Sequence, residues 1–269
     1  MKLFAAGIRK LLRRPASLIT LFFVLAIMAL IYLATSVTSD RSAGAQAQAA
    51  LDSLFGLPEA YRTLIGLILG LGGLLAVIYG AAISGSEWAW GTFKAAVARG
   101  ESRSRYILLT FASVAVVLGL GLLVAFIVGV LLVLLGATIA GSPLDGLGDA
   151  DALRALPDLL LRGWLGLVLS GGIGFAVATL TRSQLAGIAI GIGLYFGEQF
   201  SVLLLPDFVR YLPFNAASAL IATTGPEAAQ AQAITQALDP NLAVLAVAAW
   251  LVAALVLSAV AAEVAEISG

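Results

Sequence analysis

The feature that most constrains this chain is a continuous apolar run over residues 106–139 that contains no charged side chain. At about 1.5 Å per residue, a helix over this run would overrun the ~30 Å hydrocarbon core of a bilayer. The whole chain is also strongly apolar: 61% of its 269 residues are hydrophobic and only 11% are charged. A soluble domain carries about 25% charged residues. We therefore expect lipid to be the solvent for much of the chain.

Six stretches are apolar enough to cross a bilayer as helices, which takes about 20 residues each. They cover residues 16–35, 64–84, 106–139, 163–181, 185–205 and 242–262. The third is longer than a bilayer requires, so it tilts, kinks or projects beyond the membrane. The sequence predicts an all-α integral membrane protein with six spans, in a single transmembrane domain over residues 1–269.

The distribution of Lys and Arg predicts the orientation of these spans. Ten of the 15 basic residues fall on the side of the N-terminus if six spans are drawn, and five fall on the other side. This asymmetry predicts a multi-pass protein of the plasma membrane with both termini cytoplasmic. The 15 basic residues are balanced by 15 acidic ones, so no basic excess indicates nucleic acid as a partner.

The residue types that are missing exclude several kinds of chemistry. The chain has no Cys and no His, which excludes thiolate zinc sites, disulfides and catalysis that relies on imidazole. None of its three lysines, Lys2, Lys10 and Lys94, follows a glycine, so the Gly-Lys pair of a phosphate-binding loop is absent. We therefore expect no enzyme activity, no metal site and no cofactor in this chain.

The N-terminal segment, residues 1–15, has an amphipathic pattern that is typical of an interfacial helix. Its apolar face is Phe4, Ile8, Leu11 and Leu12, and Pro15 ends the pattern before the first span. Basic residues on or beside the other face are Lys2, Arg9, Lys10, Arg13 and Arg14. These charges have two compatible interpretations: they hold the N-terminus in the cytoplasm, and they contribute to a partner surface.

The segment between the second and third spans, residues 85–105, predicts a short cytoplasmic helix. Gly91 allows a turn, and Thr92 is expected to cap the helix that follows. A small apolar face is formed by Phe93, Ala96 and Val97. The cationic rim of this helix is Lys94, Arg99 and Arg103. Such a helix suits a lever for a soluble partner; the alternative is a plain cytoplasmic loop.

This segment resembles the cytoplasmic loop of permease subunits of type-2 ATP-binding-cassette exporters. The residues that carry the resemblance are Glu87, the pair Gly91-Thr92, Arg99 and the pair Ser102-Arg103. The N-terminal segment is similar to the elbow helix of that family, which also has six spans. Residues 211–217 resemble the short re-entrant helices that the family has between spans five and six, here within residues 202–224.

The resemblance implies a function and a set of partners. Two permease copies, as a homodimer, would form one substrate path, and two cytoplasmic ATPase subunits would bind ATP and magnesium. The coupling residues would be Glu87, Gly91, Thr92, Lys94, Arg99 and Arg103. The elbow residues would be Arg9, Lys10, Arg13 and Arg14.

Physical reasoning about residues 202–224 agrees with a re-entrant segment. Pro206, Pro213 and Asn215 interrupt an otherwise apolar stretch. Irregular backbone at membrane depth survives only where protein or water satisfies its polar groups. The alternative is an ordinary outside loop with an interfacial helix.

The fifth predicted span carries Glu198 and Gln199, an unusual place for a carboxylate. Glu198 has two interpretations: it lines a transport path together with Gln199, or it forms an ion pair with Arg210 or Arg62. A self-sufficient secondary transporter or channel is the alternative function, for which Glu198 is the only midplane candidate. Glycines spaced four apart, such as Gly193 and Gly197, make this span a candidate dimer interface.

Overall fold

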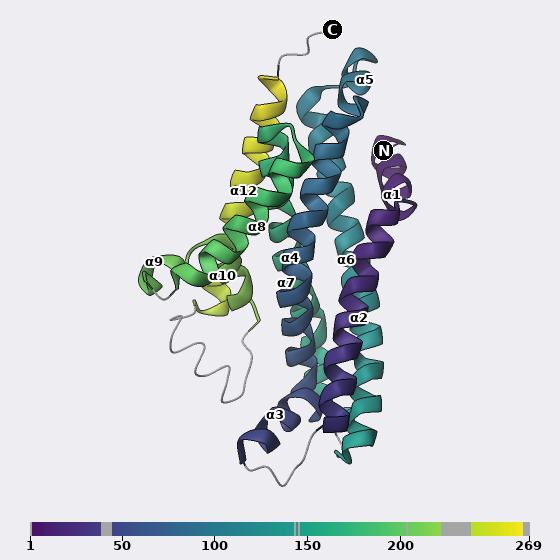
Figure 1. Ribbon diagram of the computed structural model, residues 1–269, viewed down its shortest axis with the longest axis vertical. Helices are drawn as coiled ribbons and strands as arrows, with labels where there is room; N and C mark the ends of the chain where they lie inside the picture. The colour runs from purple at the N-terminus through teal and green to yellow at the C-terminus, as the bar shows by residue number, and fades with distance from the viewer. Residues whose placement is uncertain are drawn as a thin grey trace.

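The computed structural model describes residues 2–38, 45–142, 144, 146–202, 204–221 and 238–265, which fold without strands into an elongated helical bundle (Figure 1). Five of its helices are long and apolar enough to cross a membrane. They are α2 (Pro15–Thr38), α4 (Ala60–Ala89), α6 (Arg103–Ala140), α7 (Ala150–Thr181) and α12 (Pro240–Glu263). The all-α, membrane-type fold predicted from composition is therefore confirmed, with five of the six expected spans.

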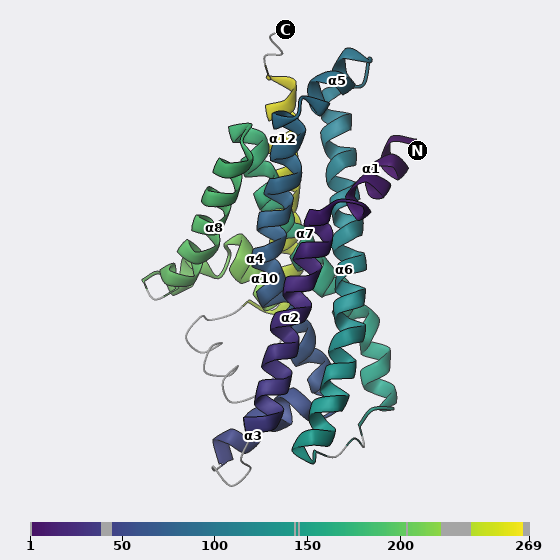
Figure 2. The ribbon, with the colours of Figure 1, turned by 45° about the vertical axis from the view of Figure 1, so that its right-hand side comes forward.

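The fifth predicted span corresponds to α8 (Gln184–Ser201), which is not among these five helices. It has 18 residues, fewer than the about 20 that a span needs, and Gln184, Glu198 and Gln199 lower its mean hydropathy. Two short helices follow it, α9 (Pro206–Val209) and α10 (Pro213–Ala219). In Figure 2, α8 starts beside the last turn of α7 and ends near α10, partway along the bundle.

The beginning of the chain and the end of α12 lie at the same end of the bundle (Figure 1). This end also carries α1 (Lys2–Leu12) and α5 (Thr92–Ala98), the two helices that the sequence predicts as elbow and lever. The opposite end carries α3 (Ala45–Phe55), which the hydropathy pattern does not predict. The ring of Phe55 anchors α3, because it packs edge-on against Tyr32 at 5.8 Å.

The start of α7 differs from the predicted span at 163–181. The helix begins at Ala150, and the Asp149 carboxylate caps it by accepting a hydrogen bond from the N–H of Ala152 at 2.7 Å. Hydropathy detects only the apolar part of a helix, and residues 150–162 contain Asp151, Arg154 and Asp158. The apolar span predicted at 163–181 thus lies within a longer helix, whose first part is polar.

The centre of the bundle is the contact between α4 and α7, which approach through glycines. A Cβ atom on Gly80 would lie 2.0 Å from the carbonyl oxygen of Gly171, and one on Gly174 would lie 2.0 Å from that of Val77. No side chain fits at either position, so the two helix backbones are in direct contact. The other helices pack around this pair.

Cysteine labelling tests how the helices cross the membrane, since the chain has no Cys of its own. Ser102 and Ala150 are exposed, and Leu204, just after α8, is 80% exposed. With both termini inside and α8 crossing, we expect an impermeant maleimide to label Ser102→Cys only from the cytoplasmic side. Ala150→Cys and Leu204→Cys should label only from the outside. Protection of Leu204→Cys, or its labelling from the Ser102 side, would contradict the sixth span.

Candidate functional site

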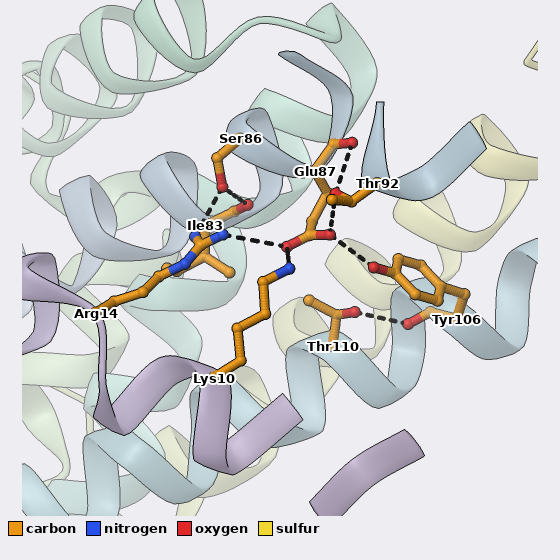
Figure 3. Close-up of polar contacts among 8 residues, drawn as sticks. All are labelled: Lys10, Arg14, Ile83, Ser86, Glu87, Thr92, Tyr106 and Thr110. Carbon is orange, nitrogen blue, oxygen red and sulfur yellow. Dashed lines mark hydrogen bonds and ion pairs between the residues drawn. The ribbon is translucent and has the colours of Figure 1, made fainter. Parts of the chain in front are cut away.

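Four helices meet at one buried carboxylate, Glu87, in the last turns of α4 (Figure 3). Its side chain is 2% exposed. The Lys10 ammonium of α1 lies 2.6 Å from Glu87 Oε1, and the Tyr106 hydroxyl of α6 donates to Oε2 at 2.6 Å. Thr92, the first residue of α5, donates its hydroxyl to Oε2 at 2.5 Å. We call this set of contacts the Glu87 cluster.

A second cation reinforces the Glu87 cluster from the junction between α1 and α2. Arg14 places Nη2 at 3.6 Å from Glu87 Oε1 and donates from Nη1 to the hydroxyl of Ser86 at 2.8 Å. A buried carboxylate is stable only when cations and hydrogen-bond donors replace its lost hydration. Glu87 has two of each, so it holds α1, α5 and the start of α6 to the end of α4.

The turn into α5 depends on Gly91, whose φ of 66° lies in the left-handed region that favours glycine. Gly91 itself occupies the cap position, and the hydroxyl of Thr92 points back to Glu87. The prediction that Thr92 caps the helix was therefore wrong. It failed because Thr92 is the first residue inside the helix, one position after the cap.

One face of α5 is fixed to the bundle by an aromatic contact. The ring of Phe93 is fully buried, with centroids 4.4 Å from that of Trp88 and 5.9 Å from that of Tyr106. The opposite face is open, with Lys94, Ala95, Ala98 and Arg99 exposed. A force applied to the open face would therefore reach α4 and α6 through rigidly packed rings.

The predicted cationic rim is split between two environments. Lys94 and Arg99 lie on the exposed side of α5. Arg103 turns away from that side, because its Nη1 donates to the carbonyl oxygens of Glu263 and Ala265, both at 2.8 Å. The Glu263 carboxylate accepts in return from the N–H of Ser104 at 3.1 Å. The start of α6 and the end of α12 thus cap one another.

We expect Arg103→Gln to loosen this reciprocal cap. The variant loses charge-assisted hydrogen bonds that are partly exposed, so the expected loss in free energy of unfolding is about 1 kcal/mol. Melting temperature in detergent measures the loss, and Arg99→Gln is the matched control because Arg99 is exposed on the same segment. Equal melting temperatures for the two variants would show that the cap contributes nothing.

The elbow residues divide in the same way. Lys10 and Arg14 point to Glu87, as Figure 3 shows, whereas Arg9 and Arg13 are exposed. The basic residues at positions 9–14 therefore lie in two different environments, which the amphipathic pattern alone does not separate. Sequence reasoning missed Ser86 and Tyr106, because Ser86 is an uncharged residue just after the second predicted span and Tyr106 is the uncharged first residue of the third.

Glu198 is buried at the end of α8 and contacts the start of α10. Its Oε2 accepts hydrogen bonds from the N–H groups of Phe214 and Asn215, at 2.9 and 3.1 Å, and from Nδ2 of Asn215 at 3.2 Å. No side chain of its own caps α10. Glu198 therefore supplies the acceptor that the first turn of a helix needs.

The predicted ion pair of Glu198 with Arg210 or Arg62 is not formed. The ion pairs among the described residues do not include Glu198, and the Arg210 guanidinium lies 5.0 Å from the centre of the Tyr211 ring instead. The prediction was wrong because the backbone of α10 compensates the carboxylate. Gln199, its predicted neighbour in a transport path, is exposed on the outer side of α8.

Part of the predicted re-entrant segment can be described. Residues 203 and 222–224 lie outside the described residues, and α9 and α10 fall between them. Two contacts hold α10 in place besides Glu198. The Trp250 Nε1 of α12 donates to the carbonyl oxygen of Tyr211 at 2.8 Å, and the Tyr195 ring of α8 packs on Phe214 at 5.0 Å.

Comparison with models of known protein families and with curated protein sequences finds no match for this chain. The geometry of the Glu87 cluster and of the α8–α10 contact therefore carries the functional argument.

Proposed function

We propose that this chain is the transmembrane permease subunit of an ATP-binding-cassette exporter of type 2. Two copies form the substrate path as a homodimer in the plasma membrane, with both termini cytoplasmic. Separate cytoplasmic ATPase subunits bind ATP and magnesium and supply the energy. This chain supplies the path and the lever, and it has no enzymatic activity itself.

The observation that carries the proposal is the Glu87 cluster. A protein that only holds its own spans together has no need for a buried carboxylate that joins an interfacial helix to a projecting one. Here Lys10 of α1, Thr92 of α5 and Tyr106 of α6 all converge on Glu87. The arrangement suits the transmission of force, because a displacement of α5 acts on three other helices at once.

The exposed side of α5 is where the ATPase would push. It carries the cations Lys94 and Arg99 beside two alanines, Ala95 and Ala98, so the surface is flat and positively charged. The left-handed Gly91 at one end of α5 and Gly100, with a φ of 90°, at the other allow sharp turns. These turns make α5 a compact projection of the bundle that a soluble partner can grip.

The alternative is a self-sufficient secondary transporter or channel. It is favoured by one observation, the buried Glu198 beside a short helix that starts near the middle of the bundle. Oε2 of Glu198 accepts all three hydrogen bonds from the first turn of α10, which leaves only Oε1 for a coupling ion. One oxygen is a poor ion site, so we prefer the exporter.

Purification separates the two functions. The chain is isolated from its native membrane in a mild detergent, and the polypeptides that elute with it are identified. We expect a soluble ATPase in equal amount and ATP hydrolysis in the eluate. If no ATPase elutes with the chain, and the chain alone moves solutes in proteoliposomes without nucleotide, the secondary transporter is correct.

A further inference from the structure

An apolar groove lies between α2, α4 and α6, with Leu167 of α7 at its base and a volume of about 70 Å³. Small residues create it: Gly72 and Ala76 on α4, and Gly121 and Ala125 on α6, line its walls. A Cβ atom on Gly121 would meet no atom within 4 Å, so nothing in the described chain fills the space beside this residue.

The length of the groove matches one leaflet of a bilayer. Its lining residues on α4 run from Tyr79, on the side of α1, to Ile68. Eleven residues separate them, which corresponds to about 16 Å along a helix. The hydrocarbon core is ~30 Å thick, so the length of the groove is about that of one leaflet.

The polarity of the groove changes along this length in the same direction as that of a lipid. Hydroxyl groups gather at the α1 end, where Ser17 lies 2.8 Å from the hydroxyl of Tyr79 and donates to the carbonyl oxygen of Leu11 at 2.6 Å. Thr20 lines the groove one turn further on. Beyond it the lining is hydrocarbon, with Val24, Ile68 and Ala125.

Positive charge lies at the polar end of the groove. Arg13 precedes Ser17 by four residues, is exposed, and makes no hydrogen bond or ion pair among the described residues. Cations at the level of the headgroups attract anionic lipids.

We propose that this groove binds one acyl chain of an anionic phospholipid from the leaflet on the α1 side, with the phosphate beside Arg13. The site is separate from the Glu87 cluster and from Glu198, and it does not depend on the exporter function. Its occupant would fill the space between α2 and α4 and so join the first span to the centre of the bundle.

Native mass spectrometry of the purified chain tests this. The protein is exchanged into a mild detergent and supplied with phosphatidylglycerol or phosphatidylcholine of the same chain length. We expect one phosphatidylglycerol to be retained per chain, and at least tenfold less of it on Gly121→Leu, whose side chain occupies the groove. Gly70→Leu is the matched control, because a Cβ atom on Gly70, on the exposed side of α4 and outside the groove lining, also meets no atom within 4 Å.

A second variant tests the headgroup. Arg13→Gln should keep a bound lipid but bind the two phospholipids equally. Size-exclusion chromatography checks that each variant is folded. Added phosphatidylglycerol should raise the melting temperature of the wild type more than that of Gly121→Leu. Equal retention by Gly121→Leu and Gly70→Leu would overturn the proposal. So would equal retention of both phospholipids by the wild type, or a protein dimer that carries no lipid.

Discussion

Replacing Glu87 with Ala is expected to release the elbow helix from the end of α4 and to uncouple the lever. The variant leaves Lys10 and the buried Arg14 without their carboxylate, and breaking a buried ion pair costs about 3–5 kcal/mol. The Lys10 side chain is 39% exposed, so solvent screens part of this. We expect a loss of about 3 kcal/mol in the free energy of unfolding, at the lower end of that range.

The functional effect is separable from the loss of stability. Glu87→Gln keeps an acceptor for the hydroxyls of Thr92 and Tyr106 but has no charge for Lys10, so it should fold better than the Ala variant. Transport per ATP hydrolysed should still fall at least tenfold in a reconstituted complex. Glu101→Gln, the same change in the segment between α4 and α6, should behave as wild type. Equal coupling in Glu87→Gln and Glu101→Gln would refute the lever.

The double variant Lys10→Met, Glu87→Gln distinguishes the ion pair from the remaining contacts. Removing both charges together avoids an unpaired buried ion, so the double variant should be more stable than Glu87→Gln alone. The elbow would then pack on α4 without an electrostatic attachment. Restored stability with impaired coupling is the expected result. Restored coupling would show that packing of α1 is enough.

Glu198→Leu is expected to detach α10 from α8. The N–H groups of Phe214 and Asn215 lose their acceptor in an apolar environment, whereas a desolvated carboxylate is removed. Hydrogen bonds to a charged group contribute about 1.5–3 kcal/mol each, and the removal of the buried charge offsets part of this. We expect a net loss of about 2 kcal/mol in the free energy of unfolding.

Three further variants test whether Glu198 holds α10 through its hydrogen bonds. Glu198→Gln keeps an oxygen for the same N–H groups, so its melting temperature should stay close to that of the wild type. Asn215→Asp places a second carboxylate against Glu198 and should destabilise the protein, and Glu198→Gln in the same chain should restore part of the loss. Gln199→Leu is the control on the exposed side of α8. A Glu198→Leu variant as stable as Gln199→Leu would show that Glu198 does not hold α10.

The sequence predicted the features that depend on composition over a long stretch. The five helices long enough to cross a membrane, the N-terminal helix α1 and the short helix after Gly91 follow from apolar length, amphipathic spacing and a glycine turn, all of which are local signals. The spans fit to within a few residues where apolar character and helix coincide. The start of α7 did not fit, because Asp149 and the polar residues after it form a helix that has no hydropathy signal.

The contacts that make the candidate sites could not be predicted from the sequence. Glu87 and Lys10 are 77 residues apart, and no spacing rule connects them. One of the two interpretations of Glu198 paired it with an arginine, because a carboxylate within a membrane usually forms an ion pair. Its actual partner is the backbone of α10, and backbone N–H groups leave no mark in a sequence.

The direct backbone contact of α4 and α7 limits how this protein can change shape. Where Gly80 lies against Gly171 there is no side chain to change rotamer and no space into which either helix can shift. A shift of α4 against α7 would therefore have to break this contact altogether. The contact between α4 and α7 is therefore expected to stay fixed, and the start of α8 lies against the same two helices through Gly85 and Gly187. In the exporter that we propose, α2 and α12 are then the helices that move relative to this pair. Distances between spin labels on α4 and α7 should stay constant through a transport cycle in which distances from α4 to α2 or α12 change.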